Sequence, residues 1–116
     1  MVANNKIFND TPAQVKKPET KELGLKYDSD KLRFDLLLPE FEECIADVLT
    51  YGAKKYAPNS WQKVEDAKNR YYASLRRHIN AYRKGEKNDT ESGLNHLAHA
   101  ACNIMFLMYF EEAIHE

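Results

Sequence analysis

The sequence is poor in cysteine, glycine and proline, with 2, 4 and 4 of these residues in 116. Two cysteines are too few for a disulfide framework, and they form no CxxC pair of the kind that binds metal or carries redox chemistry. The glycines build neither a GxxxxGK(S/T) phosphate loop nor a GxGxxG fingerprint, and no GxSxG nucleophile elbow occurs. These absences exclude several common classes of nucleotide-binding protein and hydrolase.

Long hydrophobic runs and a net charge are lacking as well. The longest apolar run, from Ile104 to Phe110, is far too short to span a bilayer, and no secretory signal is found at the start. The 17 basic and 18 acidic residues leave a formal charge of −1, so no global field attracts nucleic acid or an anionic membrane. We therefore expect a soluble protein with no nucleic-acid or membrane partner.

Cys44 and Cys102 both fall at apolar positions of predicted helices, where a cysteine usually acts as a small buried hydrophobe. Free cysteines of this kind fit a reducing cytoplasm. The length fits one domain, which is long enough to bury a core and short enough for a partner chain to complete it. Oligomerisation is therefore expected.

The composition divides the chain into an arm and a domain. Residues 1–23 are polar, contain Pro12 and Pro18 and show no periodicity, so a flexible N-terminal arm is predicted. Residues 24–116 should form the domain. Its first stretch, GLKYDSDKLRFDLLLPE, is expected to be a loop that wraps onto the core through apolar side chains, namely Leu32, Phe34 and Leu36 to Leu38.

Two stretches have the periodicity of amphipathic α-helices. The first runs from about Pro39 to Tyr56, and its apolar side chains follow an i, i+3, i+4, i+7, i+8 pattern. These are Phe41, Cys44, Ile45, Val48 and Leu49. The second stretch runs from about Asp66 to Lys84, where Gly85 provides a stop. Its expected buried stripe consists of Tyr72, Leu75, Ile79 and Tyr82.

A third helix is predicted from Ser92 to Ala113. It has almost no polar side, so it should be buried by its neighbours nearly all round. Asp89 or Ser92 is the expected N-cap. Because no β alternation or repeat competes with this pattern, the predicted fold is all-α, a compact antiparallel bundle of about three main helices that is completed by oligomerisation.

The first predicted helix carries three carboxylates, Glu40, Glu43 and Asp47, at i, i+3 and i+7, which lie within roughly one 60° sector. A hard divalent cation such as Mg²⁺ or Mn²⁺ prefers several carboxylate oxygens close together, and a polyphosphate can supply the rest. The alternative is a solvated helix face, because this sector points away from the apolar stripe. The metal-binding interpretation requires another helix to cover it.

The third predicted helix repeats this spacing with His96, His99 and Asn103. Imidazoles at i and i+3 either bind one metal together or divide the roles of metal ligand and substrate contact. The structural alternative is a buried hydrogen-bond network. Asp89 and Glu91, just before the helix, either orient the rings or supply further oxygens.

Cations and an aromatic residue surround the loop between the first two helices. Lys55 can neutralise phosphate, Asn59 offers an amide, and Trp61 can stack on a nucleobase. Arg77 lies on a basic second helix, and Lys31 lies in the early loop. The alternatives are a tryptophan that covers the core and cations that only solvate a helix surface.

Four blocks in this order carry a family resemblance: KYDSDKLRFDLLLPEFEE, VLTYGAKKYAPNSW, RYYASLRRHINAYRKGE and ESGLNHLAHAACNIMFL. Together they resemble the small phage and bacterial dATP/dGTP diphosphohydrolases of the MazZ type, within the MazG-like all-α superfamily of NTP pyrophosphohydrolases. The resemblance covers about Leu25 to Phe110. It implies an all-α homodimer or homotetramer in the cytoplasm of a bacterial or phage-infected cell. It also implies Mg²⁺- or Mn²⁺-dependent hydrolysis of a purine deoxynucleoside triphosphate to the monophosphate and pyrophosphate.

The resemblance also implies roles for individual residues. The ExxE motif of the superfamily falls on Glu40 and Glu43, which with Asp47 would be catalytic and hold the metal for attack of water on the α-phosphorus. The second motif, ExxD, falls on His96 and His99, so this sequence has histidines where the superfamily has carboxylates. Either the histidines replace these ligands, with His96 completing the metal shell and His99 contacting substrate, or Asp89 and Glu91 supply the oxygens and the histidines contact substrate. The remaining substrate contacts, to phosphate, base or sugar, would come from Lys31, Lys55, Asn59, Trp61, Arg77 and Asn103.

Two other functions remain open at this point. A non-catalytic helical module that binds a nucleotide or a protein would use the acidic stripe only as a soluble face. A histidine-rich phosphohydrolase would release inorganic phosphate instead of pyrophosphate, as the HxxH pattern of His96 and His99 suggests.

Overall fold

The computed structural model describes residues 23–112, so the predicted arm at 1–23 and the predicted helix end at Ala113 lie almost wholly outside the described residues. The chain divides into two units, Met1–Leu32 and Arg33–Glu116. In the first unit, the described residues 23–32 contain a turn and no helix or strand. There Lys31 N–H donates to the carbonyl of Asp28 at 3.0 Å.

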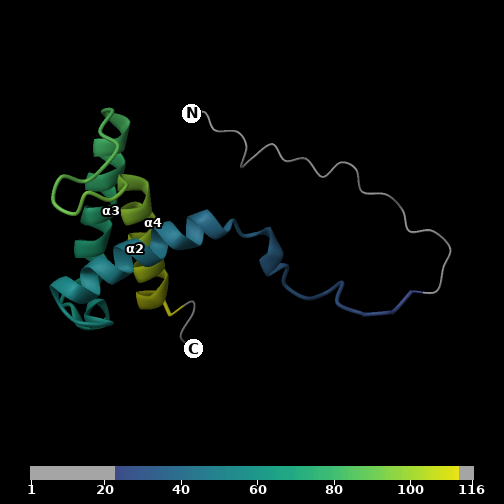
Figure 1. Cartoon of the computed structure of the whole chain (residues 1–116). Coiled ribbons are helices and arrows are strands. Elements are labelled where there is room, and N and C mark those ends of the chain that lie inside the picture. The colour runs from purple at the N-terminus through teal and green to yellow at the C-terminus, as the bar shows by residue number, and fades with distance from the viewer. Residues whose placement is uncertain (1–22, 113–116) are drawn as a thin grey trace. The chain divides into compact units, whose positions relative to one another are not determined.

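The second unit contains three α-helices and two short 3₁₀ helices. In chain order these are η1 (Phe34–Leu36), α2 (Pro39–Lys55), η2 (Ser60–Lys63), α3 (Ala67–Arg83) and α4 (His96–Phe110) (Figure 1). Residues 23–112 form no strand, so the predicted all-α class is confirmed. None of their helices is both long and apolar enough to cross a membrane.

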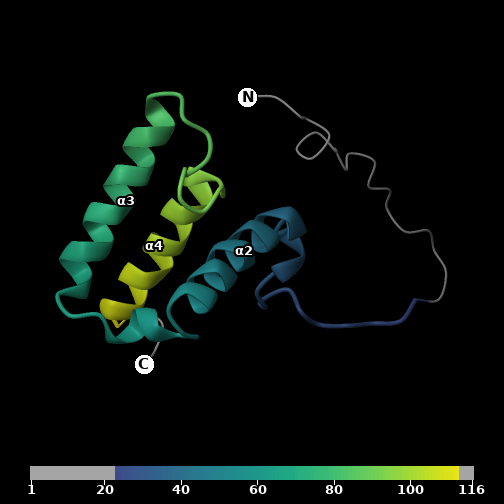
Figure 2. The same ribbon diagram turned by 60° about the vertical axis from the view of Figure 1, so that its left-hand side comes forward.

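The middle of this unit is α4, which contacts both other α-helices. Its neighbour α3 runs antiparallel beside it, whereas α2 crosses it on another side (Figures 1 and 2). The buried hydrophobic core consists of Val48, Ala98 and Cys102, with further apolar side chains packed around them. Cys102 is only 1% exposed, and burial raises the pKa of its thiol to about 11. The expected burial of Cys44 is wrong, because this side chain is exposed near the start of α2.

The helix ends follow local chemistry. Pro39 stands in the first turn of α2, where its missing N–H needs no partner. Beyond α3, Gly85 has a φ of 102°, a left-handed conformation that suits glycine. The third helix starts at His96 rather than at Ser92, because the Asn95 side chain is the N-cap and accepts from Leu97 N–H at 2.7 Å and Ala98 N–H at 3.3 Å. The predicted caps at Asp89 and Ser92 are therefore wrong.

An aromatic cluster closes the end of the unit where η2 meets α4. The Trp61 ring stacks on Phe106 with 4.5 Å between centroids, and Tyr109 meets it edge-on at 5.0 Å. Tyr71 of α3 approaches Phe106 at 4.8 Å, and its hydroxyl donates to the Trp61 carbonyl at 3.0 Å. The 3₁₀ turn therefore brings Trp61 onto the core, in agreement with the structural interpretation of this residue.

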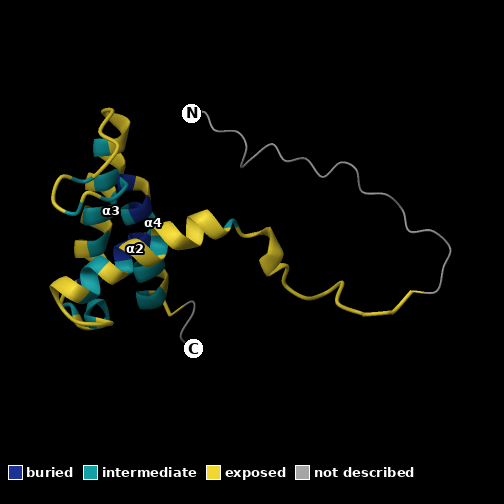
Figure 3. Ribbon diagram, in the orientation of Figure 1, coloured by how far each residue is buried: buried dark blue, intermediate teal, exposed yellow. Residues whose placement is uncertain are grey.

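Several apolar side chains expected to be buried are exposed in the single chain (Figure 3). The loop does not wrap onto the core through Phe34 and Leu36, which are both 70% exposed. On α4, Ile104 and Met108 are 48% and 45% exposed, so burial all round the helix is wrong for one chain. The physical reason is that two neighbouring helices can cover only part of the circumference of α4.

The predicted inner face of α3 is wrong for three of its four residues, whereas the fourth, Leu75, is half-buried. Tyr72 and Tyr82 are each 50% exposed and Ile79 is 40% exposed, whereas Ser74 and His78 lie half-buried. The inward face is therefore rotated from the predicted stripe. Tyrosines and isoleucine were preferred in the prediction because they are apolar, but the inward face of α3 also carries smaller and more polar side chains, such as Ser74 and His78, beside Tyr71.

A candidate metal- and nucleotide-binding groove

A groove of about 1420 Å³ lies within the second unit and is lined from α2, η2, α3, the loop after α3, and α4. Seven residues predicted from the sequence as site residues line it: Lys55, Asn59, Trp61, Arg77, His96, His99 and Asn103. These residues come from five different segments: α2, the loop before η2, η2, α3 and α4. The groove thus brings together most of the predicted substrate contacts.

The three predicted catalytic carboxylates are placed elsewhere. Glu40, Glu43 and Asp47 are exposed on α2 and are not among the residues that line the groove. Among residues 23–112 they form no recorded ion pair or hydrogen bond. Lys31 is exposed and belongs to the first unit. Their predicted roles stay predictions.

Three histidines gather on one wall of the groove. Nδ1 of His78 on α3 and Nδ1 of His96 on α4 share a hydrogen bond of 2.8 Å. The rings of His78 and His99 stack in parallel, with 4.4 Å between centroids and 5° between planes. On its other side, His99 Nε2 is hydrogen-bonded to the Ser92 hydroxyl at 2.8 Å. The pattern HxxH on α4 therefore receives a third imidazole from α3.

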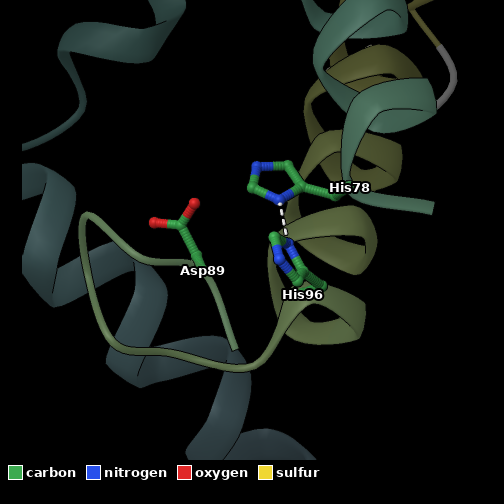
Figure 4. A group of neighbouring side chains, drawn as sticks. All are labelled: His78, Asp89 and His96. Atoms are coloured by element: carbon green, nitrogen blue, oxygen red, sulfur yellow. Dashed lines mark hydrogen bonds between the residues drawn. The ribbon is translucent and has the colours of Figure 1, made fainter. Parts of the chain in front are cut away.

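Asp89, in the loop after α3, faces two of these histidines. Figure 4 shows the His78 and His96 rings in contact and the Asp89 carboxylate projecting beside them. Possible ligand atoms of these three residues all lie within 4.8 Å of one another. The carboxylate is held by Ser92, whose backbone N–H donates to Asp89 Oδ2 at 2.8 Å.

Burial lowers the pKa of two of the three imidazoles, those of His78 and His99. Burial, together with the positive charge that His99 and His96 would carry, lowers the pKa of His78 to about 4. Burial likewise lowers the pKa of His99. For Asp89, burial alone would raise the pKa, but hydrogen bonds with Ser92 outweigh it and hold the pKa below its usual range. At neutral pH His78 and His99 therefore present unprotonated imidazole nitrogens near the Asp89 carboxylate.

His96 has an unusual environment for a buried imidazole. The residue is 5% exposed, and its Nε2 atom is buried without a hydrogen-bond partner within the described part of the chain. Glu86 Oε1 lies 3.6 Å from this nitrogen, slightly too far for a hydrogen bond. A buried polar atom without a hydrogen-bond partner costs free energy, so in folded proteins such an atom usually has a functional role or binds a water molecule or an ion.

Lys55 is paired on the rim of the groove. Its ammonium forms a salt bridge with Glu91, whose carboxylate also accepts from the Tyr51 hydroxyl at 3.1 Å. The hydrogen bond to Glu91 raises the pKa of Lys55, and the same contact lowers the pKa of Glu91. Any phosphate that binds Lys55 must therefore compete with Glu91 for it.

Asn103 joins two helices across the floor. It is 5% exposed, and its amide donates to the Ser74 hydroxyl at 3.1 Å and to the His99 carbonyl at 3.0 Å. Both amide hydrogens are thus used within the protein, and the carbonyl oxygen is the atom left for a ligand. This arrangement contains the hydrogen-bond network that was the structural alternative for these residues.

The sequence-based reasoning missed His78 as a site residue and treated it as part of a basic helix. A signal was present, since His78 stands three residues after Leu75 and four before Tyr82, two residues of the predicted buried stripe. Because Arg76 and Arg77 precede it, His78 was assigned to the basic surface of the helix. A histidine at a core position of a basic helix can reach the histidines of another helix.

The fold and the groove together indicate the class of protein. The chain is a small all-α protein whose polar groove combines imidazoles, a carboxylate, cations and an indole. The chain belongs to the family described as dATP/dGTP diphosphohydrolase, N-terminal, whose sequence profile matches residues 21–116. The resemblance to dATP/dGTP diphosphohydrolases is thereby confirmed at the level of the family.

A curated relative gives the same family name. The chain is similar to the dATP/dGTP diphosphohydrolase of Salmonella phage PMBT28, with 38% identity over 88 residues, which are 74% of this chain and 29% of that protein. The chain thus spans less than a third of the length of this relative. No solved structure matches the present chain.

Proposed function

We propose that the chain hydrolyses purine deoxynucleoside triphosphates, dATP or dGTP, to the monophosphate and pyrophosphate. The observation that carries this proposal is the groove, which gathers seven predicted site residues in a chain of this family. Its volume of about 1420 Å³ exceeds the usual range for a drug-sized ligand, so a nucleoside triphosphate has room.

The groove offers different chemistry at different places. Arg77 and, after release from Glu91, Lys55 are suited to the β- and γ-phosphates, because both are cationic and line the groove. Asn59 and the free oxygen of Asn103 are suited to the base or sugar. Trp61 stacks on Phe106, so it contributes mainly a fixed wall against which a base can rest.

The reaction is a hydrolysis without a covalent intermediate. Water adds to the α-phosphorus, the bond from this phosphorus to the bridging oxygen of the β-phosphate breaks, and pyrophosphate leaves with that oxygen. His99 is neutral near pH 7 and lines the groove, so it is suited to hold or accept a proton of the attacking water. A divalent cation, when bound, lowers the pKa of the water and neutralises charge on the phosphate oxygens.

The residues for that cation form two sets. Glu40, Glu43 and Asp47 are oxygen donors that fit the predicted Mg²⁺ or Mn²⁺, but they are exposed in a single chain. They would hold a catalytic ion only where a second copy covers this face of α2. His96, the predicted fourth ligand, instead lies in the histidine wall of the groove.

Product analysis tests the proposed function. The full chain is incubated separately with dATP, dGTP, dCTP and dTTP plus Mg²⁺ or Mn²⁺, with a chelator as control, and the products are separated by ion-exchange chromatography. Equal amounts of pyrophosphate and a purine monophosphate are expected, only when metal is present. Release of inorganic phosphate would favour the alternative phosphohydrolase, and bound but intact nucleotide would favour a binding module.

The proposed enzyme acts as a homodimer or homotetramer. Support comes from the apolar side chains that one chain leaves exposed on α4, which include Ile104 and Met108. Light scattering should give a mass at least twice that of one chain. Ile104→Glu should shift the mass toward one chain, because a charge in an apolar interface is costly, whereas Lys63→Glu, an exposed position on η2, should not. A single-chain mass for the unmodified protein would contradict the proposal.

A further inference from the structure

We propose that His78, Asp89 and His96 form a binding site for one first-row divalent metal ion of the Zn²⁺ or Co²⁺ type. The site differs from the predicted carboxylate site for Mg²⁺ or Mn²⁺ on α2. It does not rest on the proposed hydrolysis, because binding is a property of the three side chains alone.

The distances come close to those of a coordination shell. Ligand atoms of a tetrahedral site, each about 2.0–2.1 Å from the ion, lie about 3.4 Å from one another. His78 Nδ1 and His96 Nδ1 are 2.8 Å apart, and the three possible ligand atoms all lie within 4.8 Å. The rings thus need to separate slightly and the carboxylate to approach by little more than an ångström. Both are movements of side chains that line the groove.

The donor set selects the kind of ion. Two imidazole nitrogens and one carboxylate oxygen suit Zn²⁺ and neighbouring first-row ions, whereas Mg²⁺ prefers oxygen ligands throughout. Three protein ligands leave a coordination position for water or substrate, as in catalytic rather than structural zinc sites. All three residues line the groove, so this open position is accessible from it.

The surroundings supply an independent observation. His96 is 95% buried and its Nε2 atom has no hydrogen-bond partner in the described part of the chain. Glu86 Oε1 lies 3.6 Å away from that nitrogen. If His96 binds the ion through Nδ1, its Nε2–H can donate to Glu86 after a small shift. Metal-bound histidines commonly donate their other ring N–H to a carboxylate in this way.

The hydrogen bond between His78 and His96 also supports a metal site. Two neutral imidazoles in Nδ1–Nδ1 contact satisfy only one donor and one acceptor. A metal ion replaces this single bond by two coordinate bonds. Ser92 already fixes the third ligand, because its backbone N–H donates to Asp89 Oδ2 at 2.8 Å.

Cobalt spectroscopy on the full chain tests the proposal without nucleotide. One equivalent of Co²⁺ should produce visible absorption bands of a low-coordinate nitrogen and oxygen site, and excess Mg²⁺ should not remove them. His78→Ala and His96→Ala should each weaken Co²⁺ binding at least tenfold. Glu43→Gln, a matched change in the carboxylate stripe, should leave the bands intact. Equal bands in all variants, or loss only in Glu43→Gln, would overturn the assignment.

A measurement on the unmodified chain covers the case in which a histidine variant does not fold. X-ray absorption at the zinc edge should find two imidazole ligands on one bound Zn²⁺, and Zn²⁺ should raise the midpoint of thermal unfolding. A shell with no imidazole would refute the site. A chain that binds Co²⁺ in this way but hydrolyses no dNTP would refute only the proposed function.

Discussion

Replacing Arg77 with alanine is expected to lower kcat/KM for dATP and dGTP roughly 10- to 100-fold, because a hydrogen bond to a charged group contributes about 1.5–3 kcal/mol. Arg77 lines the groove from α3 and is exposed to it. Arg77 forms no salt bridge with any described residue, whereas Lys55 is held by Glu91. Arg77 is therefore available to a triphosphate without first releasing a carboxylate partner, unlike Lys55.

Steady-state kinetics with Arg83→Ala as the control tests this expectation. Arg83 lies in the last turn of the same helix but is not part of the groove lining, so its loss should change kcat/KM little. If Arg77 contacts the β- and γ-phosphates, KM should rise more than kcat falls. Equal losses in the two variants would point to a general effect of positive charge on α3 and would contradict a specific phosphate contact.

Replacing Phe106 with alanine is expected to lower the free energy of unfolding by about 3 kcal/mol, at the lower end for a phenylalanine because the side chain is only partly buried. Phe106 lies between Trp61 and Tyr71, at 4.5 and 4.8 Å between centroids. Its loss removes one aromatic contact of η2 and one of α3 with α4. The groove should lose order with it, since Phe106 and Trp61 both line it.

Urea unfolding followed by tryptophan fluorescence measures this effect directly, because Trp61 is the single tryptophan. Phe34→Ala is the matched control. Phe34 is 70% exposed in η1, so its removal should change stability by no more than about 0.5 kcal/mol. Similar losses for the two phenylalanines would mean that the aromatic cluster does not hold the unit together.

The α-helices were predictable from the sequence because helical periodicity is a local property. Both α2 and α3 begin and end within one residue of their predicted limits. The prediction was wrong where a contact between distant residues determines the boundary of a helix. The start of α4 moved to His96, since the loop before it bridges Asn88 to Asn95 and leaves the Asn95 side chain to cap the helix.

The inner face of α3 shows the same limit. Tyr72 and Ile79 are apolar and correctly spaced, yet they stay exposed while His78 faces the histidines of α4. When α3 is considered alone, two of its faces are plausible candidates for the buried side. Only the packing against α4 selects one of them, and with it the third imidazole of the site.

The candidate site was predictable in part for a related reason. His96, His99 and Asn103 share one face because helical spacing dictates it, and all three line the groove. The carboxylates Glu40, Glu43 and Asp47 share a face for the same reason, but spacing says nothing about what that face meets. In the single chain these three carboxylates are exposed and do not line the groove.

The sequence by itself determined the all-α class, the positions of the helices and the family, because these depend on local patterns and on ordered blocks of residues. The tertiary structure alone decided which side chains meet. His78 and Asp89 join His96 only through the antiparallel packing of α3 on α4 and the course of the loop between them. Contacts between distant segments depend on the relative rotation and crossing of whole helices, and no periodicity within one helix records that.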